Sequence, residues 1–324
     1  MLNKRIIVAL LFFLLFIIFL PSHRFAEEKK EEPIYDKRMA LYKKTESLTQ
    51  IPWYFIAAVD QYERQIHKDL KEDQIISIRI PQEIWFGPGN QSMDMEMIEV
   101  FNGKGKDGNG DGKADPNNGE DALLTFATMI QAYGHNEEDF KIALWEYYKR
   151  DLTVQTIKNT ARVFKEYNSI NLTERDFPVA INYNYTYRST WGDRRGFGGK
   201  RIHEGTDIFA GYGTPVHSTT YGVVELIGWN LYGGWRIGIR DIFNIYHYYA
   251  HLSGYQEGIE IGQIVKPGDV LGSVGSTGYG PPGTSGKFPP HLHYGMYKDN
   301  GYSEWSFDPY PYLRKWERMA RDNR

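Results

Sequence analysis

Two short motifs in the C-terminal half of the chain combine residue types that bind metal ions. One is His291-Leu292-His293, and the other, further upstream, runs from His203 through Glu-Gly-Thr to Asp207. Residues two apart on an extended strand point to the same face, so we expect His291 and His293 to project together and Leu292 to project away. His203 and Asp207 are four apart, and a strand would align their side chains as well.

Two imidazoles and one carboxylate from these motifs form a ligand set that zinc prefers, with one histidine to spare. Three protein ligands leave one coordination position open for water, which is the arrangement of a catalytic zinc site rather than a structural one. The chain contains no cysteine, so thiolate ligands and a disulfide framework are both excluded.

The length and composition of the chain favour two folded regions. Its 324 residues exceed the size of an average domain. A hydrophobic content of 41% is ample for packed cores. The formal net charge of -3 provides no strong positive field, so the charge balance does not indicate a nucleic-acid partner.

The N-terminal residues 1–25 have the pattern of a signal peptide or a membrane anchor. Lys4 and Arg5 precede 15 apolar residues that run from Ile6 to Leu20. This run is long for a signal-peptide core and short for a full membrane span, and residues 24–26 make a poor cleavage site. We favour an uncleaved anchor, which would attach the chain to the membrane. In either case we expect the rest of the chain outside the cytoplasm, in the cell envelope.

The remaining sequence divides into a linker, a helical region and a β region. Residues 26–36 are charged and contain a proline, so we place a disordered linker over 26–44. Apolar residues then recur with helical spacing, which predicts helices over 51–62, 119–130, 136–148 and 153–167 within a domain at 45–168. Short β-branched and aromatic runs predict strands at 215–218, 222–227, 235–239, 245–250 and 270–274 within a domain at 180–312. The predicted fold class is multidomain α and β, with a helical N-terminal domain followed by an antiparallel β domain.

Residues 180–312 resemble the zinc metallopeptidases of the lysostaphin type, peptidase family M23. The family signature is H-x(3)-D, then a His after a Tyr-rich strand, then H-x-H. This chain has His203 to Asp207, then Tyr248-Tyr249-Ala250-His251, then His291-Leu292-His293. The resemblance implies that His203, Asp207 and His293 bind zinc. It also makes His251 and His291 the catalytic pair beside the metal, without choosing which is the general base.

A basic cluster, Arg194, Arg195, Lys200 and Arg201, comes just before His203. We hypothesise that Arg194 or Arg195 pairs with a carboxylate of an anionic peptide substrate, since a planar guanidinium binds carboxylates bidentately. A solvated turn is the alternative for this cluster.

The loop 279–290 is longer than members of the lysostaphin-type family usually carry, and it ends beside the predicted site. It either shapes the substrate groove or is a tolerated surface insertion. His217 and His247 match no position of the signature, so we expect both to be structural.

Residues 45–168 resemble the lysozyme-like lytic transglycosylases. The stretch 51–63 is similar to that family's helix ending in the catalytic glutamate, and 107–122 and 143–148 are similar to downstream blocks. The resemblance implies Glu63 as a general acid. Arg64 stands where the family has Ser or Thr, and an adjacent guanidinium would keep Glu63 ionised, which is wrong for a general acid. We therefore expect a degenerate glycan-binding or positioning module, with a second active site as the alternative.

A loop within this helical region has the spacing of a calcium-binding loop. Asp107, Asn109, Asp111 and Asp115 occupy the first, third, fifth and ninth positions of an EF-hand pattern. The twelfth position is Asn118 rather than a bidentate glutamate. A weak calcium site and a plain acidic turn are the two interpretations.

The two resemblances have one substrate in common, bacterial peptidoglycan. Together they imply a zinc-dependent peptidoglycan endopeptidase that cuts stem peptides. The pair is also similar to sporulation endopeptidases of spore-forming bacilli, which implies cleavage between L-Ala and D-Glu in the spore cortex or forespore intermembrane space. The alternatives are a lytic transglycosylase acting through Glu63 and a non-catalytic protein that binds peptidoglycan glycan or peptide.

Overall fold

The computed structural model describes residues 34–67, 69, 74–196 and 199–322. The predicted signal peptide or anchor at 1–25 lies outside the described residues. Among the residues that are described, no helix is both long enough and apolar enough to cross a membrane.

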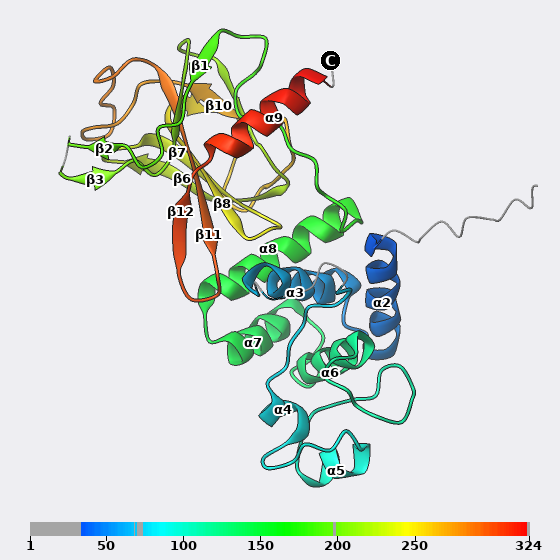
Figure 1. The fold of residues 1–324 in the computed structure, drawn as a ribbon. Coiled ribbons are helices and arrows are strands. Elements are labelled where there is room, and N and C mark those ends of the chain that lie inside the picture. Colours follow the sequence, from blue (N-terminus) through cyan, green and yellow to red (C-terminus); the bar gives the residue numbers. More distant parts are fainter. Residues whose placement is uncertain (1–33, 68, 70–73, 197–198, 323–324) are drawn as a thin grey trace, which may run out of the picture. The chain divides into compact units, whose positions relative to one another are not determined.

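The N-terminal part of the described chain is helical, as the periodicity predicts (Figure 1). Its helices are α2 (Ile34–Thr49), α3 (Trp53–Ile66), α4 (Gln82–Phe86), α5 (Met95–Val100), α6 (Gly119–Gln131), α7 (Glu137–Tyr148) and α8 (Asp151–Tyr167). The four helices predicted from apolar spacing correspond to α3, α6, α7 and α8.

The prediction of a linker over 26–44 is wrong for residues 34–44, which belong to α2. Two contacts anchor α2, and the charged composition of this segment does not reveal them. Tyr42 is buried and donates a hydrogen bond of 2.7 Å to Asp60 on α3. Arg38 is also buried and donates through Nε to the carbonyl of Ile75 at 2.9 Å. These long-range bonds hold a polar helix that sequence periodicity alone does not favour.

The C-terminal part is an antiparallel β structure, also as predicted. Its strands are β1 (Tyr185–Tyr187), β2 (Arg194–Arg195), β3 (Arg201–Ile202), β4 (Thr206–Ala210), β5 (Pro215–His217), β6 (Gly222–Asn230), β7 (Gly234–Asp241), β8 (Ile245–Tyr255), β9 (Ile264–Val265), β10 (Val270–Val274), β11 (His291–Asp299) and β12 (Glu304–Phe307). The main path of the large sheet runs β1-β4-β11-β8-β7-β6-β9, and β2 pairs with β3 separately.

Strand β11 lies inside this path, between β4 and β8. Its residues alternate between the core and the opposite face. Leu292, Tyr294 and Met296 are buried in the sheet core, while His291 and His293 lie on the other face. The predicted side-by-side placement of the two histidines is therefore confirmed.

The helical and β parts are packed together within one compact unit, residues 34–324. Val223 on β6 belongs to the same buried cluster as the apolar faces of α3 and α8. Arg150, at the start of α8, binds Asp299 at the end of β11 through two hydrogen bonds of 2.8 Å. Figure 1 shows the hairpin of β11 and β12 reaching the helices.

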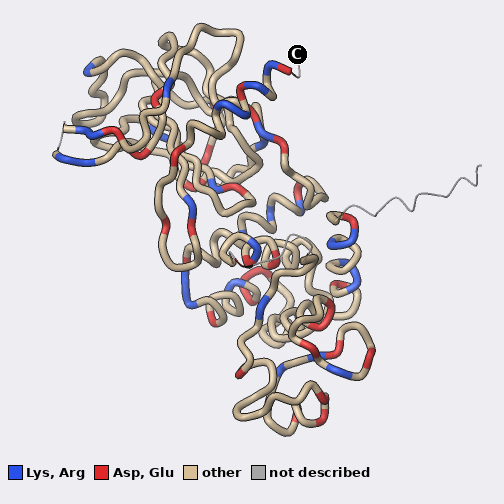
Figure 2. Tube along the Cα trace, in the orientation of Figure 1, with Lys and Arg blue, Asp and Glu red and all other residues tan. Residues whose placement is uncertain are grey.

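Helix α9 (Tyr310–Asp322) is the last element of the described chain. Leu313 and Trp316 on this helix are buried in the core of the β part. Its polar face is tied down by Glu317, which accepts hydrogen bonds from Tyr185 at 2.7 Å and Tyr187 at 2.6 Å. Figure 2 shows charges of both signs interspersed along the chain, in keeping with its small net charge.

Candidate active site

Three side chains from the two sequence motifs converge at one point beside β11. Nε2 of His203 lies 3.0 Å from Oδ1 of Asp207, and Nδ1 of His293 lies 3.1 Å from the same oxygen. The two ring nitrogens are 2.8 Å apart. Among the described residues, this trio is the set of His, Cys, Asp or Glu side chains whose ligand atoms come close enough to share a metal ion.

Strand pairing fixes two of the three ligands. Asp207 on β4 is the direct partner of His293 on β11. Gly205 makes room for this pair, because a Cβ atom there would lie 2.6 Å from Cε1 of His293. The glycine of the H-E-G-T-D motif is thus needed for the close approach of the imidazole ring.

His203 is not aligned with Asp207 by a strand, so that part of the sequence interpretation is wrong. β3 ends at Ile202 and β4 begins at Thr206, which leaves His203 in the connecting loop. Thr190 positions it instead: the Thr190 carbonyl accepts a hydrogen bond of 2.8 Å from Nδ1 of His203. Since a carbonyl only accepts, Nδ1 carries the proton and Nε2 presents its lone pair to the site.

Thr190, which sequence reasoning missed, also positions the second ligand, Asp207. Its hydroxyl oxygen accepts a hydrogen bond of 3.1 Å from the backbone N–H of Asp207. Outer contacts of this kind orient metal ligands and fix their tautomers. No spacing rule in the sequence marks Thr190, because it acts through its backbone carbonyl as much as through its side chain.

The environment of Asp207 keeps its carboxyl ionised. Burial on its own raises the pKa of Asp207, but the close contacts with His203 and His293 outweigh burial and hold the pKa well below its ordinary value. Arg195 adds a further contact, with Nη2 lying 2.6 Å from Oδ2 of Asp207. Oδ2 is thereby occupied, and Oδ1 is left to face the two imidazoles.

This donor set fits a zinc ion. Two neutral imidazole nitrogens and one carboxylate oxygen are the ligand types of catalytic zinc sites. Burial lowers the pKa of His293, so its ring is neutral and available as a ligand at neutral pH. The prediction that His203, Asp207 and His293 bind zinc is therefore consistent with their geometry.

His251 and His291 lie beside the ligand trio. Their ring centroids are 4.6 Å apart. Nδ1 of His251 donates to the Thr277 carbonyl at 2.7 Å, and Nδ1 of His291 donates to the Pro289 carbonyl at the same distance. In the neutral form of each ring, this hydrogen bond fixes the tautomer in which Nε2 carries no proton.

A bulge in β8 turns His251 toward the site. Tyr249 and Leu252 both face the core, so one extra residue interrupts the alternation between them. His251 has a φ of +63°, in the left-handed region that non-glycine residues rarely occupy. Strict alternation would have placed His251 on the core side with Tyr249. Burial, followed by the charges of His291 and His293, lowers the pKa of His251 to about 3, so this imidazole is neutral at physiological pH.

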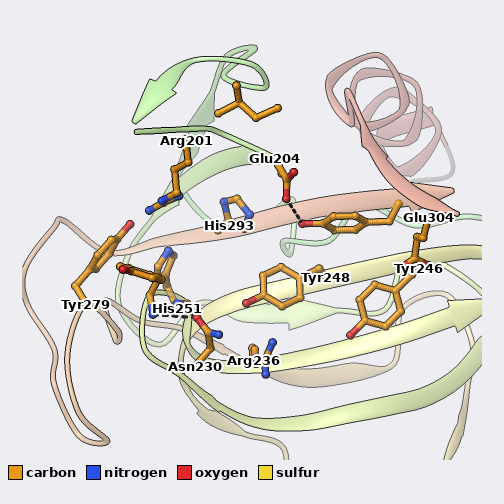
Figure 3. Close-up of a pocket in the computed structure, with 14 residues that line it drawn as sticks. Arg201, Glu204, Asn230, Arg236, Tyr246, Tyr248, His251, Tyr279, His293 and Glu304 are labelled. Carbon is orange, nitrogen blue, oxygen red and sulfur yellow. Dashed lines mark hydrogen bonds between the residues drawn. The ribbon is translucent and has the colours of Figure 1, made fainter. Parts of the chain in front are cut away.

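A groove of about 480 Å³ opens from this centre (Figure 3). His251 and His293 line one part of it. Tyr279, from the long loop 279–290, also lines it and stacks on the ring of His251 at 5.3 Å, in keeping with the first of the two interpretations of this loop. Arg201 and Arg236 contribute cationic side chains.

The predicted substrate role of Arg194 and Arg195 stays a prediction. Both lie on β2, and neither is among the residues that line the groove. Arg195 instead contacts the ligand Asp207. His247, predicted to be structural, is completely buried and hydrogen-bonds with Tyr294 at 2.6 Å.

Among the described residues Arg64 forms its ion pair with Asp60 rather than with Glu63, and its expected effect on Glu63 stays a prediction. Adjacent helical residues do not face each other, and Arg64 points to Asp60 at 3.3 Å. Glu63 is buried, 3% exposed, and its two oxygens contact the hydroxyl of Tyr148 and, at 2.8 Å, Nε2 of His67. Glu63 is not among the residues that line the groove beside the metal ligands, and its expected role as a general acid stays a prediction.

The loop with EF-hand spacing is held by backbone contacts. Asp107 accepts hydrogen bonds from the backbone N–H groups of Gly110 and Gly112, both at 2.7 Å. Asn118, in the twelfth position, caps α6. Within the described chain, Asp107, Asp111 and Asp115 do not form a cluster with ligand atoms close enough to share an ion. Calcium binding through these residues and Asn109 stays a prediction.

Known proteins are similar to this chain over different lengths. Peptidase family M23 matches residues 201–306. The L-Ala--D-Glu endopeptidase of Bacillus subtilis (strain 168) is 59% identical over 97% of this chain and 98% of that protein. Lysostaphin of Staphylococcus staphylolyticus is 35% identical over 35% of this chain and 22% of its own length. A solved structure of a putative glycyl-glycine endopeptidase from Ruminococcus gnavus is 36% identical, with a TM-score of 0.41, and covers 57% of this chain and 74% of that one.

Proposed function

This chain belongs to peptidase family M23 and is a metalloendopeptidase, and on that premise we propose that it uses zinc to cleave peptidoglycan stem peptides between L-Ala and D-Glu. One observation carries the proposal: Asp207, His203 and His293 converge at the end of a groove that also holds His251. The relative that matches almost the full length is named for this bond.

The histidines outside the ligand trio supply the proton transfers. Hydrolysis adds a water oxygen to the carbonyl carbon of L-Ala and breaks the C–N bond to D-Glu. Zinc, when bound, supplies Lewis-acid polarisation and acidifies water. His251 or His291 takes the proton through its free Nε2, and the proton is delivered to the departing nitrogen of D-Glu.

The predicted location follows from this substrate. We propose that the enzyme acts outside the cytoplasm, on spore cortex peptidoglycan or in the forespore intermembrane space. Support comes from the N-terminal apolar run of the sequence and from the name of the Bacillus subtilis relative.

For the helical region we propose a positioning role. Arg150, the N-cap residue of α8, forms two hydrogen bonds with Asp299, the last residue of the strand that carries His291 and His293. We also propose that the helical region has a lysozyme-like fold and binds glycan. A second, transglycosylase activity would need Glu63, which is buried between Tyr148 and His67.

Mass spectrometry of a peptidoglycan digest tests the proposed function. We expect purified, zinc-loaded protein to release L-Ala-ended glycan fragments and peptides with a new amino terminus at D-Glu, and a chelator to abolish the release. Products that carry an anhydromuramyl end and persist with chelator would establish a transglycosylase instead. Cosedimentation with peptidoglycan and no product would establish a binding protein.

A further inference from the structure

The groove beside the metal ligands contains a cation that no described carboxylate neutralises. Arg236 lies on β7, next to Ile237, which faces the core, so its side chain projects to the groove face. Figure 3 shows its guanidinium beside Asn230 and below the ring of Tyr248. Across the described residues, no ion pair within 4.0 Å involves Arg236.

The guanidinium is also incompletely hydrogen-bonded. Nε of Arg236 is buried and has no hydrogen-bond partner in the described structure. A buried donor without a partner costs free energy, and a bound water, ion or ligand would remove this cost. The position of the cation is supported by Tyr248, whose ring centroid lies 5.9 Å from the guanidinium carbon.

The acidic residues that line the groove form hydrogen bonds with residues other than Arg236. Glu304 accepts a hydrogen bond of 2.8 Å from Arg240. Glu204 accepts one of 3.4 Å from Tyr297. Neither forms an ion pair with Arg236, so the charge of Arg236 is available to an anionic ligand.

The ring of Tyr248 lies close both to Arg236 and to the metal ligand His293. The ring of Tyr248 contacts Arg236 on one side and lies 5.9 Å, centroid to centroid, from the ring of His293. One aromatic side chain therefore separates the guanidinium from a metal ligand. A carboxylate bound by Arg236 must belong to a residue at, or next to, the bond that is cut.

We infer that Arg236 is a specificity-determining residue that binds the free α-carboxylate of D-Glu on the leaving side of the scissile bond. The inference rests on the proposed function. D-Glu in a stem peptide continues the chain through its γ-carboxyl group, so its α-carboxylate is free and is attached to the same carbon as the departing nitrogen. A guanidinium matches such a carboxylate with two parallel hydrogen bonds. Amidation of this carboxylate removes the charge and one acceptor.

Three synthetic stem tripeptides, L-Ala–γ-D-Glu–meso-diaminopimelate and its two amides, test the inference. One amide carries D-isoglutamine in place of D-Glu, and the other is amidated on diaminopimelate. For the zinc-loaded full chain we expect kcat/KM to fall about 10- to 100-fold on the D-isoglutamine peptide and to change little on the diaminopimelate amide. Equal rates on all three peptides, or discrimination only at diaminopimelate, would overturn the inference.

Variants assign that selectivity to a residue. We expect Arg236→Gln to lose about 10- to 100-fold on the unmodified peptide while cutting the D-isoglutamine peptide within a few-fold of the wild type. Arg236→Lys should restore part of the selectivity, because it retains the charge without the bidentate fork. Arg318→Gln, an exposed substitution on α9, is the matched control. Zinc content and thermal unfolding of each variant report on folding.

Two outcomes separate the inference from the proposed function. If the wild type cuts the L-Ala–D-Glu bond but Arg236→Gln slows both peptides equally, or if Arg194→Gln abolishes selectivity instead, the inference is wrong and the function stands. If the zinc-loaded wild type cuts none of the tripeptides and none of the peptidoglycan, both are wrong.

Discussion

Asp207 and His293 face each other as directly paired residues of β4 and β11, with Oδ1 of the carboxylate 3.1 Å from Nδ1 of the ring. Because side chains alternate along a strand, a slip of one residue in this pairing would send one of them to the other face of the sheet. The metal site is therefore fixed by the register of the sheet as well as by the sequence motifs.

Asp207→Asn tests the carboxylate in this pair. The substitution keeps the size of the side chain but removes the charge that the two imidazoles face, so we expect zinc to be lost and activity to fall by on the order of 10³-fold. Metal analysis after dialysis and a stem-peptide assay measure both effects. Asp176→Asn, at a carboxylate that contacts His217 rather than the trio, serves as the control. Full zinc content with normal turnover in Asp207→Asn would contradict the assigned ligand set.

Arg195→Gln separates a positioning role from substrate binding. Nη2 of Arg195 lies 2.6 Å from Oδ2 of Asp207, and loss of such an outer contact weakens metal affinity by about 10- to 100-fold. A competition titration with a zinc chelator measures the affinity, and Arg194→Gln, the exposed neighbour on β2, should leave it unchanged. An unchanged zinc affinity in Arg195→Gln, with a loss that depends on substrate charge, would favour the role suggested by the sequence.

His251→Ala and His291→Ala should separate catalysis from metal binding. Neither ring belongs to the ligand trio, so we expect both variants to retain zinc. Removing a general acid or base costs about 10²- to 10⁴-fold in rate. The kcat of each variant on one stem peptide measures how much the replaced histidine contributes to that rate. The variant whose pH profile loses its acid limb identifies the general base. Zinc loss in either variant would place that histidine among the ligands.

The histidine pair of β11 could be predicted from sequence because strict alternation holds there. His251 could not be placed in this way, because the bulge after Tyr249 reverses its side and no sequence rule marks a bulge at that point. The spacing predicts His203 on a strand with Asp207, but His203 lies in a loop and is positioned by the Thr190 carbonyl. Arg236 was missed because an arginine between Trp235 and Ile237 has the ordinary pattern of a half-buried strand.

Helices with a clear apolar stripe, such as α3 and α8, were predicted within a few residues. Helix α2 was not, because its stability depends on contacts with distant parts of the chain: Arg38 bonds to the carbonyl of Ile75. The position of the Arg64 side chain also depends on the three-dimensional structure. Sequence adjacency suggested a contact with Glu63, whereas helix geometry turns the guanidinium toward Asp60, one turn earlier.

The buried pair of His247 and Asp241 predicts that stability falls in mild acid. Burial, foremost, lowers the pKa of His247 below 6.5, its ordinary value, so the folded protein resists protonation that the unfolded chain accepts. The stabilisation is complete above pH 6.5 and is lost as the pH falls toward the folded pKa, with a limiting slope of about 1.4 kcal/mol per pH unit. Asp241, whose pKa is also lowered, although burial itself raises it, loses its contribution at still lower pH, below 3.8.

Urea unfolding of the metal-free protein between about pH 7.5 and pH 5 measures this slope. The range extends to both sides of the ordinary histidine pKa of about 6.5. We expect His247→Asn to flatten it and to lower the free energy of unfolding at pH 7.5, whereas His135→Asn, at an exposed position, should reproduce the wild-type curve. An identical slope in His247→Asn and the wild type would show that another group is responsible.

Arg150→Met tests the attachment of the helical region to β11. Asp299 is completely buried and receives two hydrogen bonds of 2.8 Å from Arg150, with Asn244 as a weaker partner at 3.3 Å. Removing the arginine leaves a buried carboxylate without its cation, which costs about 3–5 kcal/mol in comparable sites. Because Asp299 ends the strand that begins at His291, we expect weaker zinc binding together with the loss of stability.

Urea unfolding and a zinc titration of the same variant give both quantities. The control is Lys141→Met, which breaks an exposed pair with Glu138 and should change stability by less than about 1 kcal/mol. If Arg150→Met unfolds at a lower urea concentration but binds zinc as the wild type does, the helical region stabilises the fold without positioning the metal ligands. If it unfolds as the wild type does, the ion pair contributes nothing to the attachment, and the apolar contacts of α8 with β6 hold the two regions together.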